Sequence, residues 1–184
     1  LLTVDVHRVR LPLVRPFRTS FGEQAGRGVL VVRVETDAGV GWGECAADVD
    51  PHYSPEFNDS SRLALVDHLV PLLFAAGDGL SGAAVADLLA PVKRHRMAKE
   101  GLEVAVLDAE LRAAGVRLAD HLGGVRDAVD VGVSVGITDD PEVLGAWVAE
   151  YLDEGYRRIK LKIEPGADVE RVAAIRELVG DGFP

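Results

Sequence analysis

Two lysines separated by one residue, Lys160 and Lys162, are the side chains of this sequence best suited to acid–base chemistry. The surrounding segment, residues 158–163, has the pattern of a β-strand, in which alternate side chains share a face. Both ammonium groups would therefore lie on one face, about 7 Å apart. Burial and mutual repulsion each lower a lysine pKa, and such a lysine can act as a general base near neutral pH. The pair therefore indicates proton transfer.

The spacing alone leaves an ordinary alternative open, in which two lysines near a strand end simply reach water. The neighbouring elements bear on this choice, because helices are predicted on both sides of the strand. Parallel strands flanked by helices are normally covered on both faces. A buried ammonium is costly unless an anion compensates it. A covered pair would therefore need anions nearby, and the choice between a catalytic pair and a solvated pair stays open at this point.

The elements that would position these lysines alternate between strand and helix. Asp140 precedes Pro141, which is typical of a helix start, and Gly155 marks the end of the same helix. The order is a strand over 131–137, a helix over 140–154, a strand over 158–163 and a helix over 168–179. This alternation with short connections is typical of parallel βα units. Two such units do not complete a domain, and residues 181–184 resemble a loop that leads to a third strand.

The first 125 residues have a different pattern, that of an α+β section. Strands are predicted over 3–13, 29–35 and 40–45, with a turn at Asp37-Ala38-Gly39 between the last two. Helices are predicted over 61–76, 85–89 and 97–114, the last with an apolar stripe of Leu102, Val106, Ala109 and Ala113.

Between the first two strands, residues 14–28 are predicted to form a loop interrupted by glycines. This loop carries two aromatic side chains, Phe17 and Phe21, which is unusual for a merely solvated connection. Either the two rings anchor the loop on the core or they close over a ligand. The sequence favours neither alternative.

Several motifs, taken in order along the chain, resemble the muconate-lactonizing subgroup of the enolase superfamily. Within this subgroup, the sequence resembles most the o-succinylbenzoate synthases that also act as N-acylamino acid racemases. It rests on Arg-Arg-Ile-Lys-Leu-Lys-Ile-Glu-Pro-Gly at 157–166, Pro-Phe-Arg-Thr-Ser-Phe-Gly at 16–22, Gly-Trp-Gly-Glu-Cys at 41–45, the helical segments 95–99 and 107–113, and the strand 131–137. A single Lys-x-Lys is weak evidence, whereas this ordered set is specific and spans nearly the whole chain.

The resemblance implies an α+β capping domain over residues 1–125. It implies that residues 126–184 form the first βα units of a (β/α) barrel, incomplete before the third strand. It also implies a metal-dependent carbon–oxygen lyase or racemase. The reaction would be dehydration of a cyclohexadiene carboxylate in menaquinone synthesis, racemisation of N-acylamino acids, or both.

The resemblance also suggests roles for individual residues. Lys162 would be the acid/base that removes a proton next to a carboxylate, and Lys160 would assist electrostatically. Ser134 would face the substrate, and Phe17 and Phe21 would help to close the site. Tyr53, in the loop after the predicted hairpin, is expected to approach the substrate as well.

The family binds Mg²⁺ through acidic residues on the third, fourth and fifth barrel strands, so the ligands are expected beyond residue 184. The acids that follow Lys162 fall in predicted turns or on a helix: Glu164, Asp168, Glu170, Glu177 and Asp181. A (β/α)₈ barrel needs about 250 residues. We therefore predict that residues 1–184 alone neither bind Mg²⁺ tightly nor turn over a substrate.

The overall charge excludes some classes of partner. Lys and Arg number 20 and Asp and Glu number 30, which gives a net charge of −10. A surface this acidic disfavours nucleic acid and anionic membranes as main partners. The single cysteine, Cys45, is expected to pack in a core, and a cytoplasmic location is the default expectation. As partners we expect a small carboxylate substrate and, at full length, further copies of the chain.

Two alternatives to a synthase or racemase stay open at this point. One is a dipeptide epimerase or muconate-type cycloisomerase of the same superfamily. The other is a complete small α/β module in which Lys160 and Lys162 hold an anion. The module predicts a cooperative monomer, whereas an incomplete barrel predicts exposed apolar strand edges and association.

Overall fold

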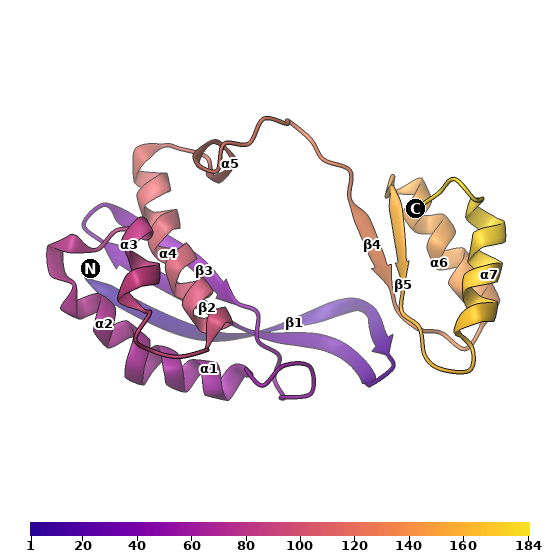
Figure 1. The fold of residues 1–184 in the computed structure, drawn as a ribbon, viewed down its shortest axis with the longest axis horizontal. Helices are drawn as coiled ribbons and strands as arrows, with labels where there is room; N and C mark the ends of the chain where they lie inside the picture. Colours follow the sequence, from indigo (N-terminus) through magenta and orange to yellow (C-terminus); the bar gives the residue numbers. More distant parts are fainter. The chain divides into compact units, whose positions relative to one another are not determined.

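The computed structural model describes residues 1–184, except for the surroundings of Gly79, and its contacts divide the chain into two units (Figure 1). Unit 1 contains residues 1–11 and 27–125, and unit 2 contains residues 12–26 and 126–184. One division between the contact units falls after residue 125, and residues 12–26 group with the second unit. The domain bounds 1–125 and 126–184 stay a prediction. The α+β section followed by βα units is confirmed as the fold class.

A three-stranded sheet in the order β1-β2-β3 forms the framework of unit 1. Its strands are β1 (Thr3–Thr19), β2 (Gly22–Thr36) and β3 (Gly39–Cys45). On β2 the side chains of Leu30, Val32 and Val34 alternate along the strand and are completely buried, as expected for one face of a sheet. β2 and β3 are antiparallel, with Leu30 opposite Cys45. Cys45 itself is buried in this core, as predicted.

The predicted loop over residues 14–28 is wrong for most of its length. β1 continues to Thr19 and β2 begins at Gly22, so only Ser20 and Phe21 connect the two strands. The two strands are hydrogen-bonded neighbours, and the long ribbon satisfies the backbone groups that a loop would have left to solvent. Glycines in this segment thus interrupt a strand pattern without ending the strands.

Helices of unit 1 pack on one another and on the sheet. Helix α4 makes its main contact with β3, and glycines on that strand permit an unusually close approach. A Cβ atom at Gly43 would lie 1.9 Å from the Gly101 carbonyl oxygen, and one at Gly41 would lie 2.1 Å from the Ala105 carbonyl oxygen. The helical elements are α1 (Asn58–Ala64), a π-helical turn (Leu65–Leu69), α2 (Val70–Ala75), a 3₁₀ turn (Gly77–Gly79), α3 (Gly82–Leu88), α4 (Arg96–Ala114) and α5 (Leu118–His121).

The buried stripe of α4 is built from smaller residues than expected. Ala98, Gly101 and Ala105 are buried along it beside Leu102 and Val106. The predicted member Ala113 is exposed instead. At the start of the helix, the Glu56 carboxylate accepts hydrogen bonds from the backbone N–H groups of Met97 at 3.1 Å and Ala98 at 2.8 Å. This side chain therefore satisfies two donors that the first turn of a helix leaves unpaired.

Unit 2 contains the two predicted βα units, with a small apolar core. Asp140 caps its first helix, accepting a hydrogen bond from the Glu142 N–H at 2.9 Å, and Gly155, with φ of +92°, follows the end of that helix. The elements are β4 (Gly132–Val135), α6 (Pro141–Asp153), β5 (Arg158–Leu161) and α7 (Asp168–Val179). The core cluster is formed by Val135, Leu144, Val148 and Ile175.

Candidate functional site

The two lysines lie at and just beyond the carboxyl end of β5, beside β4. The two strands pair in parallel, and the register places Ser134 directly beside Lys160. Lys162 follows the last residue of β5 and continues the ladder, because its backbone N–H donates to the Val135 carbonyl at 2.9 Å. Since alternate residues share a face, Ser134, Lys160 and Lys162 are brought to the same side of the pair. The structure therefore gathers three of the predicted site residues at one edge.

The side chains of Lys160 and Lys162 are less covered than expected for a parallel strand flanked by helices. Lys160 is exposed, whereas Lys162 is half-buried. In the two-stranded sheet of unit 2, both helices cover the opposite face, where Ile159 and Leu161 pack against the core. Only part of the expected cover on the lysine face is thus present. The Ser134 hydroxyl is buried and has no hydrogen-bond partner.

Phe17 provides the cover of Lys162. Its ring centroid lies 5.7 Å from the Lys162 Nζ atom, within the range of a cation–π contact. A Cβ atom at Gly136 would lie 3.2 Å from the backbone nitrogen of Arg18, so glycine at this position permits the close approach of the hairpin tip. The ring thus lies over the candidate base, a position that fits the alternative in which it closes over a ligand.

The remaining predicted substrate contacts are placed differently. Phe21 is in the two-residue turn between β1 and β2 and is 58% exposed. Tyr53 belongs to unit 1, in the segment between β3 and α1, and is 73% exposed. The roles of Phe21 and Tyr53 in substrate binding stay predictions, as do those of Ser134, Lys160 and Lys162.

Four charged side chains form a closed ring of ion pairs next to Phe17. We call Arg18, Asp139, Glu164 and Arg171 the charge ring. Arg18 contacts the Asp139 carboxylate at 2.8 Å and the Glu164 carboxylate at 3.5 Å. Arg171 contacts the same two carboxylates, Glu164 at 2.9 Å and Asp139 at 3.5 Å. The neighbouring Asp139 carboxylate raises the pKa of the Arg18 guanidinium, so this group keeps its positive charge.

A second arginine attaches the hairpin to α6. The Arg15 guanidinium contacts both carboxylate oxygens of Glu150 at 2.9 Å. It also lies 5.3 Å from the ring centroid of Trp147 and 5.4 Å from that of Tyr151, which are cation–π distances. The hydrogen bond to Glu150 raises the pKa of Arg15. These contacts explain why residues 12–26 group with unit 2.

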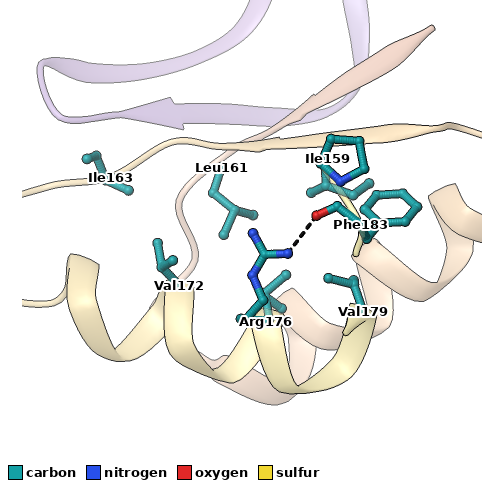
Figure 2. A pocket seen from close by; sticks show the side chains of 9 residues that line it. Ile159, Leu161, Ile163, Val172, Arg176, Val179 and Phe183 are labelled. Atoms are coloured by element: carbon teal, nitrogen blue, oxygen red, sulfur yellow. Dashed lines mark hydrogen bonds between the residues drawn. The ribbon is translucent and has the colours of Figure 1, made fainter. Parts of the chain in front are cut away.

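An apolar groove of about 200 Å³ lies between β5 and α7 (Figure 2). Because alternate residues of a strand share a face, this groove is on the face opposite the two lysines. Ile159, Leu161 and Ile163 form its strand side. Its polar feature is Arg176, whose Nη1 atom donates to the Phe183 carbonyl at 2.6 Å. The groove is part of the packing between strand and helix and contains no acid–base pair, so it is not the candidate site.

The residues of this chain do not fit a metal site at the lysine face. Among the described residues, no group of three or more His, Cys, Asp or Glu side chains is placed to hold a metal ion. The acid nearest in sequence to Lys162 is Glu164, and its carboxylate is already engaged by Arg18 and Arg171. A carboxylate shared by two guanidinium groups is a poor ligand for a dication, because both cations would repel the metal.

Comparisons with known proteins agree with this architecture. The family model described as "Mandelate racemase / muconate lactonizing enzyme, N-terminal domain" matches residues 2–123. The chain belongs to this family. The resemblance to the enolase superfamily is thereby confirmed, and a solved member of that superfamily from Listeria innocua Clip11262 superposes with a TM-score of 0.85 at 33% identity, covering 95% of this chain and 47% of that one.

Two relatives of this chain carry names that state an enzymatic activity. An N-succinylamino acid racemase from Amycolatopsis sp is 56% identical over 179 residues, which are 97% of this chain and 48% of the relative. An o-succinylbenzoate synthase from Bacillus subtilis (strain 168) is 38% identical over 174 residues, 94% of this chain and 46% of the relative. The chain thus spans about half the length of the relatives it matches. Within the described part of the chain, no helix is long and apolar enough to cross a membrane.

Sequence reasoning missed the two arginines that fix the hairpin tip. Arg18 was part of a recognised motif, but its partners lie 121 and 146 residues away. No local spacing connects residues so distant. Residues 14–18, Val-Arg-Pro-Phe-Arg, do not alternate strictly, so the strand that carries the two arginines left no clear local signal.

Proposed function

We propose that these residues form the cap and the first part of the barrel of an enzyme that racemises N-succinylamino acids, forms o-succinylbenzoate, or does both. The observation that carries the proposal is the position of Lys162. It stands at the carboxyl end of a barrel-type strand, the usual location of catalytic groups in this architecture, with Ser134 and Lys160 beside it. The names of the 56% and 38% identical relatives support the substrate class.

In this proposal Lys162 accepts the proton on the carbon next to the substrate carboxylate. The Lys160 ammonium, on the same face, attracts the carboxylate, and the unpartnered Ser134 hydroxyl donates a hydrogen bond to the substrate. Phe17 keeps water away from the Lys162 amine. The carbanion that forms requires a cation to hold its charge. We propose Mg²⁺ for this role, with ligands outside residues 1–184, since the described residues offer no suitable set.

A chimeric enzyme provides the test. Residues 1–184 would replace the corresponding half of the Amycolatopsis relative, and racemisation of an N-succinylamino acid would be followed by polarimetry and by deuterium uptake at the α-carbon. General acid–base groups contribute about 10²–10⁴-fold to rate. We therefore expect Lys162→Ala to reduce racemisation at least about a hundredfold, and Lys160→Ala to raise KM more than it lowers kcat.

Two controls accompany the chimera assay, one for the class of substrate and one for metal binding. A cyclohexadiene substrate, a dipeptide and a muconate, assayed in parallel, separate synthase, epimerase and cycloisomerase activities. Isothermal titration of Mg²⁺ into residues 1–184 alone should give no tight binding. A folded chimera that racemises equally well with and without the Lys162 amine would refute the assignment of the base.

A further inference from the structure

The hairpin tip is joined to the ends of both barrel-type strands at once. The Ile137 N–H, just after β4, donates to the Arg18 carbonyl at 2.9 Å. The Arg18 side chain then reaches Asp139, also after β4, and Glu164, after β5. The backbone and the side chain of one residue therefore fix the tip against the two segments that carry the candidate chemistry.

Phe17 precedes Arg18, and its ring is the group that covers Lys162. In an extended strand neighbouring side chains point to opposite faces. Arg18 thus does not contact Lys162 itself, but it determines where the preceding ring lies. Arg15, in contrast, attaches the ribbon to α6 through Glu150.

We propose that Arg18 is a positioning residue, which holds Phe17 over the Lys162 amine through the charge ring. Opening of the ring at its exposed side, where Asp139 and Arg18 keep 77% and 34% of their side-chain surface exposed, would uncover Lys162 without unfolding unit 2. The other two members, Glu164 and Arg171, are more deeply placed, with 25% and 13% exposed. The apolar core of the unit, around Val148, is separate from the charge ring. A catalytic role for this arrangement rests on the proposed function, whereas the contacts between the charge ring, Phe17 and Lys162 do not.

Because Arg18 is held by two carboxylates, those of Asp139 and Glu164, its position should depend on the salt concentration and on the shape of its cationic group. Arg18 bridges two carboxylates from different segments, which its planar, forked guanidinium can do and a lysine ammonium, a point charge, does less well. Exposed ion pairs weaken as ionic strength rises, and in 1 M salt the screening length falls to about 3 Å. High salt should therefore mimic the loss of Arg18.

Competitive acylation of lysines on the 184-residue chain tests the inference. A limiting amount of sulfo-N-hydroxysuccinimide acetate would be added at pH 8, and modification at each lysine would be quantified by peptide mass spectrometry. The exposed Lys160 serves as internal standard for Lys162. We expect Arg18→Ala to raise the ratio of acylation at Lys162 to acylation at Lys160 about threefold to tenfold. This is the size expected when a weak ion pair and a cation–π contact are lost. Arg18→Lys should restore part of the protection.

Two controls keep the outcome decisive. Arg8→Ala removes another β1 arginine that is ion-paired with an aspartate, Asp59, but in unit 1, and should leave the ratio unchanged. Asp139→Asn and 1 M NaCl on the unaltered chain should each raise the ratio even if Arg18→Ala fails to fold. An unchanged ratio in a folded Arg18→Ala, or an equal rise in Arg8→Ala, overturns the inference. Because no turnover is measured, this outcome is independent of the chimera assay.

Discussion

The two units of the chain are stabilised in different ways. In unit 1, strands and helices enclose a continuous apolar core that includes Leu30, Leu65, Leu73 and Leu102, all fully buried. In unit 2, Val135, Leu144, Val148 and Ile175 form the buried core cluster, with partly buried apolar side chains packed against it, and ion pairs of Arg15 and Arg18 join the hairpin to this unit. Apolar burial contributes roughly 25 cal/mol per Å², whereas an exposed ion pair contributes at most about 1 kcal/mol. The candidate chemistry therefore lies in the unit with the weaker intrinsic cohesion.

The largest effect should come from Gly43→Ala in unit 1. The added Cβ would lie 1.9 Å from the Gly101 carbonyl oxygen, a backbone atom that cannot move aside alone. Separation of α4 from β3 should cost about 3 kcal/mol or more. Urea unfolding followed by circular dichroism measures the loss. A variant with unaltered stability would show that the contact between the two elements is looser than described.

Helix capping should show a smaller difference between the units. Glu56→Ala removes two bonds to the half-buried first turn of α4, and Asp140→Ala removes the exposed cap of α6. We expect losses of about 1–2 kcal/mol for the first and about 0.5–1 kcal/mol for the second. Amide hydrogen exchange in the two first turns locates each effect. Equal losses would argue against burial as the origin of the difference.

Gly145→Ala in unit 2 should have the opposite sign to Gly43→Ala. Gly145 lies within α6, and an added Cβ would meet no atom within 4 Å. Alanine in a helix interior is favoured over glycine by about 0.5–1 kcal/mol. Urea unfolding of the variant should show this gain. Destabilisation would mean that the helix surface at this position is packed against something further.

The smallest effect concerns a carboxyl group of unit 1. Partial burial raises the pKa of Glu100, and the nearby Glu44 and Glu103 raise it further. The protonated form is therefore favoured by folding, so its stabilising effect is present below the ordinary pKa and is lost as pH rises through the raised one. Glu100→Gln should match the unaltered chain at pH 3.5 and gain a few tenths of a kcal/mol by pH 7. Thermal unfolding across this range measures the difference.

Asp120→Asn is the matched control for this titration. The Arg117 side chain lowers the pKa of Asp120, so this carboxylate stabilises the fold above its ordinary pKa and loses that effect as the pH falls. The variant should therefore be less stable than the unaltered chain at neutral pH and equal to it in acid. The same pH trend in both variants would contradict the two assigned causes.

Local patterns predicted much of both units. The helix at Asp168–Val179 has the predicted bounds, and α4 begins one residue earlier than predicted, because apolar spacing and helix-end residues are short-range signals. The parallel pairing of β4 with β5 also followed from the βα alternation, whereas the register that puts Ser134 beside Lys160 came only from the structure.

The features that could not be predicted from the sequence depend on contacts between segments that are far apart in the chain. The ribbon that replaces the predicted loop exists because β1 and β2 pair with each other, and glycines alone gave no sign of this. Gly101 and Ala105 face β3 because Gly41 and Gly43 remove side chains from the other surface, a match visible only once the elements are packed. The charge ring is likewise built from four separate segments.

The shared ribbon of β1 and β2 has a consequence for the order of folding. Unit 1 has its last core residue at Ala109, so it can fold while the chain is still being synthesised. The tip of the same ribbon must wait for Glu164, 55 residues after Ala109, which takes roughly 3–11 s at about 5–20 residues per second. During this interval Phe17 and Arg18 lack the partners that unit 2 supplies, which leaves an unpaired aromatic ring that chaperones could bind on the nascent chain.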